Sequence, residues 1–369
     1  MKKYKFNEFI ILHDKKRIPL SSIERKKRQG NYRYYGAQGV IDHINDYIFD
    51  GKFVLLAEDG ENLKSKKQNI AQYVTGKFWV NNHAHIITTT DICRLKYFYY
   101  LINTIDVSEY ITGSAQPKLS QISMNKMEFE IPEIKVQDKI LSILNAIDKK
   151  ITLNNEINKN LLQQTQALYN HSFPYTVSDV LPEGWRLGTA SEIIEIHDSK
   201  RIPLSGAQRD KMEKKIYPYY GAAALMDYVD EYIFDGKYLL LGEDGTVVDD
   251  AGFPILQYVW GQFWVNNHAH ILTGKLGYNV ESLYMLFKQT PVKSIVTGAV
   301  QPKISQANLK SIPVVIPPAN LIIAFNNQVN EMFALIRNIE EENKSLSTLR
   351  DSLLPKLMSG EIDVSELDL

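Results

Sequence analysis

Two histidine pairs are the residues of this chain whose types and spacing could do chemistry. His83-Ala84-His85 and His268-Ala269-His270 each place two imidazoles at alternate positions, which puts them on one face of a predicted strand. The carboxylates of Glu58-Asp59 and Glu243-Asp244 lie upstream, and together these groups are a ligand set for a divalent metal, as in a metal-dependent nuclease. The simpler interpretation is that neighbouring polar groups hold the histidines and that Asp59-Gly60 is a hairpin turn. We therefore predict no metal site.

The histidine pairs belong to a repeat that covers most of the sequence. Five segments of the first half return in the second: 16–21 as 200–205, 34–37 as 219–222, 47–52 as 232–237, 78–85 as 263–270, and 116–118 as 301–303. His83 and His268, like Pro117 and Pro302, lie 185 positions apart. A repeat of this length is a duplicated domain, because solenoid periods run from about 20 to 50 residues. Two equivalent modules imply a target with two equivalent parts.

Composition excludes several classes of protein. With 369 residues and 44% hydrophobic content, each half is long enough to bury its own core. The net charge of -1 excludes a uniformly basic nucleic-acid coat, although it allows local basic patches. The single cysteine, Cys93, fits a reducing compartment. Neither a signal peptide nor an apolar run of about 18 residues is present, so we expect a cytoplasmic protein without a membrane partner.

Each copy changes its periodicity at a proline. Before Pro132 and Pro317, short aromatic and β-branched segments such as 47–56 and 78–88 predict strands, with Asp-Gly pairs as the tight turns between them. Some helix is expected at 92–105 and 281–287. Past each proline the pattern predicts a helix of roughly 35 residues with an apolar stripe.

The two long helices are predicted to pair through these stripes as an antiparallel coiled coil. Asn158 and Asn343 occupy equivalent stripe positions, where buried amides can fix the register. The alternative is that the helices complete the core of one compact domain. The predicted fold class is α+β, with two pseudo-symmetric mixed α/β heads separated by the coil. The predicted helix-pairing residues are Ile140, Leu144, Ile147, Ile151, Leu161 and Leu168 with Phe325, Val329, Met332, Ile336, Leu346 and Leu353.

Several segments carry a family resemblance. The run 349–362 resembles the closing segment of the DNA-specificity (S) subunit of Type I restriction-modification systems, and 148–168 resembles that family's central region. Segments 35–37, 78–85 and 116–118 are similar to its target-recognition domains. One departure is that the lead-in around Trp185 is shortened in the first copy. The resemblance implies a first target-recognition domain at 1–132, a central helical spacer at 133–172, a second target-recognition domain at 173–317 and a C-terminal helical spacer at 318–369.

The resemblance implies an adaptor that reads double-stranded DNA and does no chemistry. Two modification (methyltransferase) subunits would dock on the helices, and restriction (translocase/nuclease) subunits would join them. S-adenosylmethionine, ATP and Mg would then belong to the partner subunits, with no cofactor in this chain. The sequence agrees, because it contains neither the Asn-Pro-Pro-aromatic or Asp-Pro-Pro-aromatic motif of an amino-methyltransferase nor an ATP-binding Gly-x-x-x-x-Gly-Lys-Ser/Thr loop. A two-headed scaffold that binds proteins and never touches DNA remains the alternative.

A DNA reader needs cations for phosphates and polar side chains for base edges. A charge run usually marks a solvated face, but the recurrence of Lys-Arg-Ile-Pro-Leu-Ser favours a function. Gln-Pro-Lys sits in a short loop of each copy, and the paired tyrosines could stack on sugars or be half-buried strand residues. The predicted DNA-binding residues are Lys16, Arg17, Lys26, Lys27, Arg28, Arg33, Tyr35, Gln116 and Lys118 with Lys200, Arg201, Lys214, Lys215, Tyr220, Gln301 and Lys303.

The closeness of the two copies predicts related half-sites in inverted orientation, separated by an unread spacer. The copies differ most at 21–33 against 205–218 and at 61–71 against 246–256. We expect differences between the half-sites to be encoded there.

Overall fold

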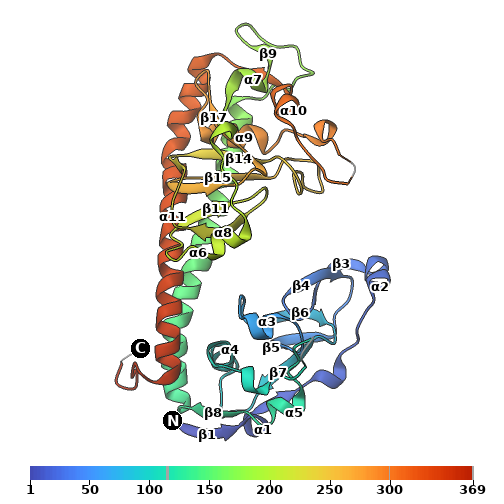
Figure 1. The fold of residues 1–369 in the computed structure, drawn as a ribbon, viewed down its shortest axis with the longest axis vertical. Coiled ribbons are helices and arrows are strands. Elements are labelled where there is room, and N and C mark those ends of the chain that lie inside the picture. The colour runs from blue at the N-terminus through green and yellow to red at the C-terminus, as the bar shows by residue number, and fades with distance from the viewer. Residues whose placement is uncertain (114–115, 299, 368–369) are drawn as a thin grey trace. The chain divides into compact units, whose positions relative to one another are not determined.

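The computed structural model describes residues 1–113, 116–298 and 300–367. The chain divides into two compact units: the first unit is Met1–Leu153 with Glu342–Leu369, and the second unit is Asn154–Glu341. Each unit holds one mixed α/β head and one part of each of two long helices, α6 (Ile134–Ser172) and α11 (Ala319–Ser359) (Figure 1). The predicted fold class is confirmed. In the described residues, no helix has the length and apolar character needed to cross a membrane.

The head of the first unit is built on a six-stranded sheet of order β2-β7-β5-β6-β3-β4. The β3–β6 pair is parallel and the other pairs are antiparallel. Val54, Leu55 and Leu56 of the central strand β5 are fully buried, so apolar side chains cover both faces of the sheet. The strands are β1 (Lys2–Lys5), β2 (Ile10–Leu12), β3 (Gln29–Tyr35), β4 (Val40–Ile44), β5 (Phe49–Ala57), β6 (Ala71–Val80), β7 (Ala84–Thr89) and β8 (Glu128–Ile131), and the helices before α6 are α1 (Phe6–Phe9), α2 (Ser22–Lys27), α3 (Asn62–Ser65), α4 (Leu95–Thr104) and α5 (Gln121–Met124).

The head of the second unit repeats this plan with a break in the sheet. Eight of its strands form two four-stranded sheets, β10-β17-β14-β15 and β12-β11-β16-β13, and β9 pairs with β18 in a separate two-stranded sheet. Gly236, with φ +126°, separates β13 from β14, and Gly261, with φ +78°, separates β15 from β16. The strands are β9 (Arg186–Thr189), β10 (Ile194–Ile196), β11 (Tyr217–Tyr220), β12 (Leu225–Val229), β13 (Phe234–Asp235), β14 (Tyr238–Gly242), β15 (Leu256–Val259), β16 (Gln262–Val265), β17 (Ala269–Gly274) and β18 (Pro313–Ile316), and the helices before α11 are α7 (Ala190–Ile193), α8 (Gly206–Asp210), α9 (Val280–Phe287) and α10 (Gln306–Lys310).

Three local predictions about strands and turns were wrong. Asp50-Gly51 is not a turn, because it lies inside β5 and pairs with Lys77 and Gly76 of β6. Segment 78–88 is not one strand but the end of β6 and most of β7, joined by a turn at 81–83. Asp59-Gly60 does not close a hairpin, since it opens a longer connection that contains α3.

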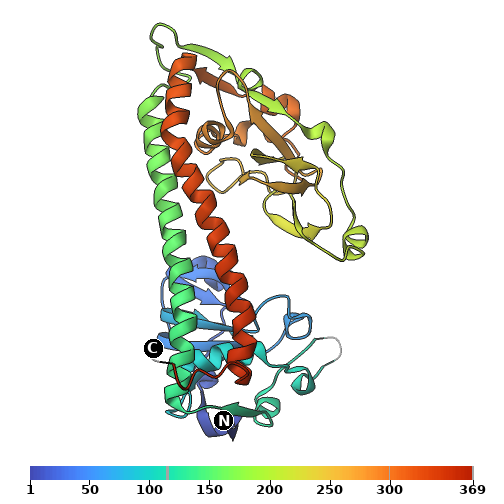
Figure 2. The ribbon, with the colours of Figure 1, turned by 90° about the vertical axis from the view of Figure 1, so that its left-hand side faces the viewer.

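The long helices both pair with each other and complete the heads. In each unit, part of α6 lies beside part of α11 (Figure 2). Ile140, Leu144 and Ile147 are buried, and the first two join the core of the first head together with Leu357 and Met358 of α11. In the second unit, the core holds Phe325, Val329 and Ile336 of α11 with Tyr169 of α6 and Phe173, which directly follows α6. The stripe positions Ile151, Leu161, Leu168, Met332, Leu346 and Leu353 are half-buried.

A buried amide between the helices gives a first prediction. Asn158 donates from Nδ2 to the carbonyl of Ile336 at 3.4 Å, while its Oδ1 has no hydrogen-bond partner among the described residues. An unsatisfied buried polar atom costs about 1–3 kcal/mol. We therefore expect Asn158→Leu to raise the free energy of unfolding of the second unit by about 1 kcal/mol, measured by denaturant titration. The exposed Asn160 on the same helix is the control, and a destabilised Asn158→Leu variant would contradict the assignment.

Candidate nucleic-acid interface

The turns at one end of the sheet lie together in the first head. Glu58 N–H donates to the carbonyl of His83 at 2.9 Å, and Gly60 N–H donates to the carbonyl of Pro117 at 3.1 Å. The Trp79 indole donates to the carbonyl of Ile18 at 2.6 Å. These bonds join turns that are far apart in the sequence into one surface. We define the first loop edge as residues 16–21, 36–39, 58–60, 81–83, 112–113 and 116–118.

The second head makes the same bonds at equivalent positions. Glu243 N–H donates to the carbonyl of His268 at 2.8 Å, and Gly245 N–H donates to the carbonyl of Pro302 at 3.0 Å. The Trp264 indole donates to the carbonyl of Ile202 at 2.6 Å. We define the second loop edge as residues 200–205, 221–224, 243–245, 266–268, 297–298 and 300–303.

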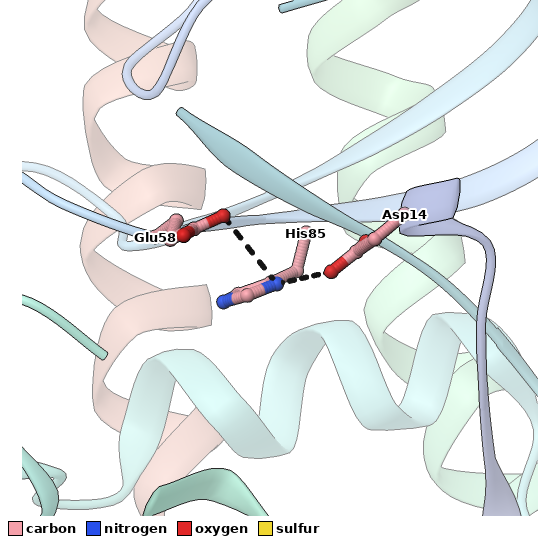
Figure 3. A group of neighbouring side chains, drawn as sticks. All are labelled: Asp14, Glu58 and His85. Carbon is pink, nitrogen blue, oxygen red and sulfur yellow. Dashed lines mark hydrogen bonds and ion pairs between the residues drawn. The ribbon is translucent and has the colours of Figure 1, made fainter. Parts of the chain in front are cut away.

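Beneath the first loop edge lies a cluster of ionisable side chains, which we call the first ion cluster: Asp14, Arg17, Glu58, His85 and Lys118. His85 lies between the two carboxylates, with Nδ1 at 2.5 Å from Asp14 Oδ2 and 3.9 Å from Glu58 Oε2 (Figure 3). His85 and Asp14 are almost completely buried, with relative exposures of 1% and 7%. Arg17 binds Glu58 at 2.7 Å, and Lys118 binds the other Glu58 oxygen at 3.1 Å.

Hydrogen bonds outside the cluster fix the imidazole and the Asp14 carboxylate. His85 Nε2 lies 2.8 Å from the carbonyl oxygen of Leu119, which can only accept. Asp14 accepts from the backbone N–H of Ile86 at 2.8 Å and from the side chain of Gln121 at 2.6 Å. Both ring nitrogens of His85 therefore face oxygen atoms, the carboxylate of Asp14 on one side and the carbonyl of Leu119 on the other.

The second ion cluster, of Asp198, Arg201, Glu243, His270 and Lys303, has nearly the same geometry. His270 Nδ1 lies 2.6 Å from Asp198, and its Nε2 lies 2.8 Å from the carbonyl of Ile304. Arg201 binds Glu243 at 2.6 Å, and Lys303 binds it at 3.2 Å. Since all five residues and their contacts recur, the cluster is a common part of both heads.

The pKa values of the buried carboxyl groups respond to this arrangement. Burial opposes ionisation of Asp14, but the hydrogen bond and charge of His85, with the N–H of Ile86 and the amide of Gln121, outweigh it and lower the Asp14 pKa. Burial also opposes ionisation of Glu58, and the hydrogen bonds from Arg17 and Lys118 lower its pKa. The pKa of Asp198 is lowered in the same way, with His270 in place of His85.

The ion clusters are better suited to holding the fold than to binding a metal. Their possible ligand atoms on Asp14, Glu58 and His85 all lie within 4.8 Å of one another, as a metal site would need. However, both nitrogens of His85 are already hydrogen-bonded, and Arg17 and Lys118 neutralise Glu58. The donors are therefore satisfied by the chain itself, and we assign the clusters a structural role.

The other histidine of each pair faces away from the core. His83 and His85 do not share one strand face as expected, because His83 belongs to the turn before β7. The His83 side chain is 47% exposed, and its Nδ1 binds Asp59 at 2.8 Å, which leaves Nε2 toward solvent. His268 is paired with Asp244 in the same way and is 44% exposed. Sequence reasoning missed these exposed histidines as binding candidates, although their recurrence with Asp-Gly was a usable signal.

The predicted DNA-binding residues fall into two groups. The first group is exposed, and its members make no ion pair or side-chain hydrogen bond with any residue that the structure describes. These side chains are available to a ligand in solution. They are Lys16, Lys26, Lys27, Lys200, Lys214, Gln116 and Gln301.

The second group already has partners within the chain. The guanidinium of Arg17, 15% exposed, also donates to the carbonyls of Asn82 and Ala84, and Arg201 does the same in the second head. These two arginines hold their loops and do not offer a free charge. The side chains of the remaining members stay partly exposed to solvent although they are paired. The pairs are Arg28 with Asp46 at 3.2 Å, Arg33 with the Thr75 carbonyl at 2.7 Å, Lys215 with Asp227 at 3.5 Å, Lys118 with Glu58 and Lys303 with Glu243.

The two predicted tyrosines lie mostly inside the sheet. Tyr35 is buried and packs on Phe78, and Tyr220 is half-buried against Phe263. Burial raises the pKa of Tyr35 and raises that of Tyr220 to about 12.

Comparison with known proteins agrees with a duplicated DNA reader. The family model described as the Type I restriction modification DNA specificity domain matches twice, at residues 1–163 and 182–344. A Haemophilus influenzae type I restriction enzyme specificity subunit, S.HindORF215P, is 32% identical over 118 residues, which cover 32% of this chain and 30% of that protein. The MjaIX specificity subunit of Methanocaldococcus jannaschii is 24% identical over 312 residues, which cover 74% of this chain and 70% of that protein.

A solved structure shares the fold. The crystal structure of the S subunit of a Type I restriction-modification system from M. genitalium aligns with a TM-score of 0.55 and 15% identity, over 96% of this chain and 95% of that one. The double match of the family model covers most of the sequence. The chain therefore belongs to the family of DNA-specificity subunits of Type I restriction-modification systems, which are the components of those complexes without a catalytic centre or cofactor.

Proposed function

We propose that each head reads one half of a bipartite DNA target and that the paired helices dock two modification subunits, which restriction subunits then join. S-adenosylmethionine, ATP and Mg act in those partner chains, in the cytoplasm. The working domains are 1–132 and 173–317 for reading, and 133–172 and 318–369 for spacing and docking. This proposal gives the duplicated heads a target with two parts.

One observation carries the proposal: the two loop edges expose the same polar side chains. Lysine, asparagine, histidine and glutamine recur on both, supported by the same buried ion cluster. A binding surface kept twice in one chain suits a ligand that presents similar groups twice, and duplex DNA does so. The recurring pairs are Lys16 and Lys200, Asn82 and Asn267, His83 and His268, Gln116 and Gln301, and Lys118 and Lys303.

In this proposal, the exposed lysines without partners among the described residues bind the DNA phosphates. Most of the affinity comes from Lys16, Lys26 and Lys27 in the first head and from Lys200 and Lys214 in the second. These cations break no internal ion pair when they bind phosphate. Gln116 and Gln301 contribute direct contacts to DNA. Arg28, Arg33, Lys118, Lys215 and Lys303 can add weaker contacts with the charge that their own partners leave exposed. Arg17 and Arg201 act indirectly by fixing the lysines that precede them.

The half-sites are proposed to be related sequences in inverted orientation. Both heads share the framework of the loop edge, and a two-fold relation between readers gives an inverted relation between the sequences they read. The differences between half-sites are assigned to 21–33 and 61–71 against their counterparts 205–218 and 246–256. The second of these changes from a lysine-rich segment to one with Asp249 and Asp250.

A gel-shift series on the assembled complex tests DNA reading. Five lysine contacts predict that log K falls against log salt concentration with a slope of about −4 or steeper. A target-bearing duplex should also be preferred to a scrambled duplex at every salt concentration. A scaffold for neutral protein partners would bind neither duplex, and that result would reject the proposal.

A further inference from the structure

The turn that follows β3 differs from its counterpart in the second head. It reads Gly-Ala-Gln-Gly at 36–39, whereas the turn after β11 reads Gly-Ala-Ala-Ala at 221–224. Gln38 therefore stands where the second head has Ala223. Both turns belong to their loop edges, so the difference lies within the surface that the heads otherwise share.

The two turns are closed by the same backbone hydrogen bond. Gly36 N–H donates to the carbonyl of Gly39 at 2.8 Å, and Gly221 N–H donates to the carbonyl of Ala224 at 2.9 Å. In each head the strand pairing shifts by one residue just beyond the turn, at Ile41 in the first head and Met226 in the second. Positions 38 and 223 are thus equivalent in hydrogen-bonding pattern as well as in sequence, although the residue that follows differs: Gly39 has a φ of +149°, and Ala224 does not have a positive φ.

The Gln38 side chain is exposed and lies against the centre of the first loop edge. A methyl group placed on Gly60 would lie 3.8 Å from Gln38 Nε2. Gly60 is itself hydrogen-bonded to the carbonyl of Pro117, between Gln116 and Lys118. Among the residues that the structure describes, none is hydrogen-bonded to the Gln38 amide. A free primary amide is therefore presented beside the proposed DNA contacts.

A primary amide and a methyl group recognise different bases. The amide of glutamine pairs in a bidentate manner with N6 and N7 of adenine in the major groove, whereas alanine offers only apolar contact. We propose that Gln38 is a specificity-determining residue of the first head, reading an adenine in its half-site, and that the second head lacks this contact. The inference rests on the proposed function and adds one position at which the half-sites differ.

Two reciprocal substitutions test the proposal in cells that express the complete system. The readout is the methylated motif, obtained by sequencing of modified bases. Gln38→Ala should lower the preference for adenine at one position of one half-site by roughly 5- to 150-fold and leave the other half-site unchanged. Ala223→Gln should create a new adenine preference at the mirrored position of the other half-site. Ala307→Gln places the same side chain on α10, which packs against α7, and should change nothing.

The outcomes distinguish a failure of the role of Gln38 from a failure of the proposed function on which it rests. A wild-type motif that survives both Gln38→Ala and Ala223→Gln without change would overturn the role of Gln38 while leaving DNA reading intact. A wild-type system whose methylated motif is not bipartite would instead contradict the proposed function. If Gln38→Ala abolished methylation at every site, the gain of preference in Ala223→Gln would still decide the matter, because that variant does not depend on the folding of the other.

Discussion

Replacing Asp14 with asparagine is expected to lower the free energy of unfolding of the first unit by about 3–5 kcal/mol. The substitution removes the carboxylate that lies 2.5 Å from the buried His85 ring. It also places an amide N–H₂ against a donor, either at Oδ1, where Ile86 donates, or at Oδ2, where His85 and Gln121 lie. Breaking one partner of a buried ion network is among the most costly single changes in a protein. Asp198→Asn should do the same to the second unit. Calorimetry of the purified chain measures both.

An exposed aspartate of the same head provides the control. Asp50 lies on β5 and is exposed, and Asp50→Asn removes the same charge without touching the ion cluster. Its effect should stay within about 0.5 kcal/mol. Equal effects of Asp14→Asn and Asp50→Asn would show that the cluster does not stabilise the head.

The cluster also predicts how stability depends on pH. The Asp14 and Glu58 pKa values are lowered in the folded state, so the unfolded chain takes up protons first as the pH falls. The stabilisation is therefore complete above the ordinary carboxyl pKa of about 4 and is lost as the pH falls through the lowered values. The difference in stability between wild type and Asp14→Asn should shrink below pH 4. A difference that stays constant down to pH 2 would contradict the charge assignment.

Neutralising the five free lysines is expected to have the largest effect on DNA binding. The variant carries glutamine at Lys16, Lys26, Lys27, Lys200 and Lys214. Each phosphate contact contributes a slope of about 0.9 to the salt dependence, so the slope should become less steep by about 4 to 5. Between 50 and 200 mM salt, the wild-type affinity should fall roughly 500-fold more than that of the variant. Gel shift of the assembled complex gives both slopes.

Two lysines outside the loop edges serve as the matched control. Lys126 and Lys310 are exposed and lack ion-pair partners in the part of the chain that the structure describes. Lys126→Gln with Lys310→Gln should change the slope by less than about 1. If the control and the five-lysine variant lost the same affinity per charge, the contribution would come from net charge and not from the positions of the five lysines.

The repeat and the helical stripes were enough to predict the architecture. The 185-residue offset defines two heads, and the apolar stripe past each proline predicts both long helices, because both signals are local or repeated. The turns were less predictable. Asp50-Gly51 looks like a turn in sequence, yet it pairs with a strand about 26 residues away, and only the tertiary register reveals this.

The roles of the binding residues were also only partly predictable from the sequence. Lys16 and Arg17 are adjacent cations, and the sequence predicts one role for both. The structure separates them, because Arg17 binds Glu58, 41 positions further on, and belongs to the first ion cluster, while Lys16 stays free. Asp14 carried no motif of its own, and its recurrence as Asp198 was the signal that could have identified it.

The most direct test of the account is the methylated motif of the wild-type system, read across the genome by sequencing of modified bases. Two heads with matching loop edges predict two short blocks separated by an unread spacer, with most positions of one block appearing as the reverse complement of the other. A single uninterrupted motif, or two blocks with no inverted relation, would contradict it.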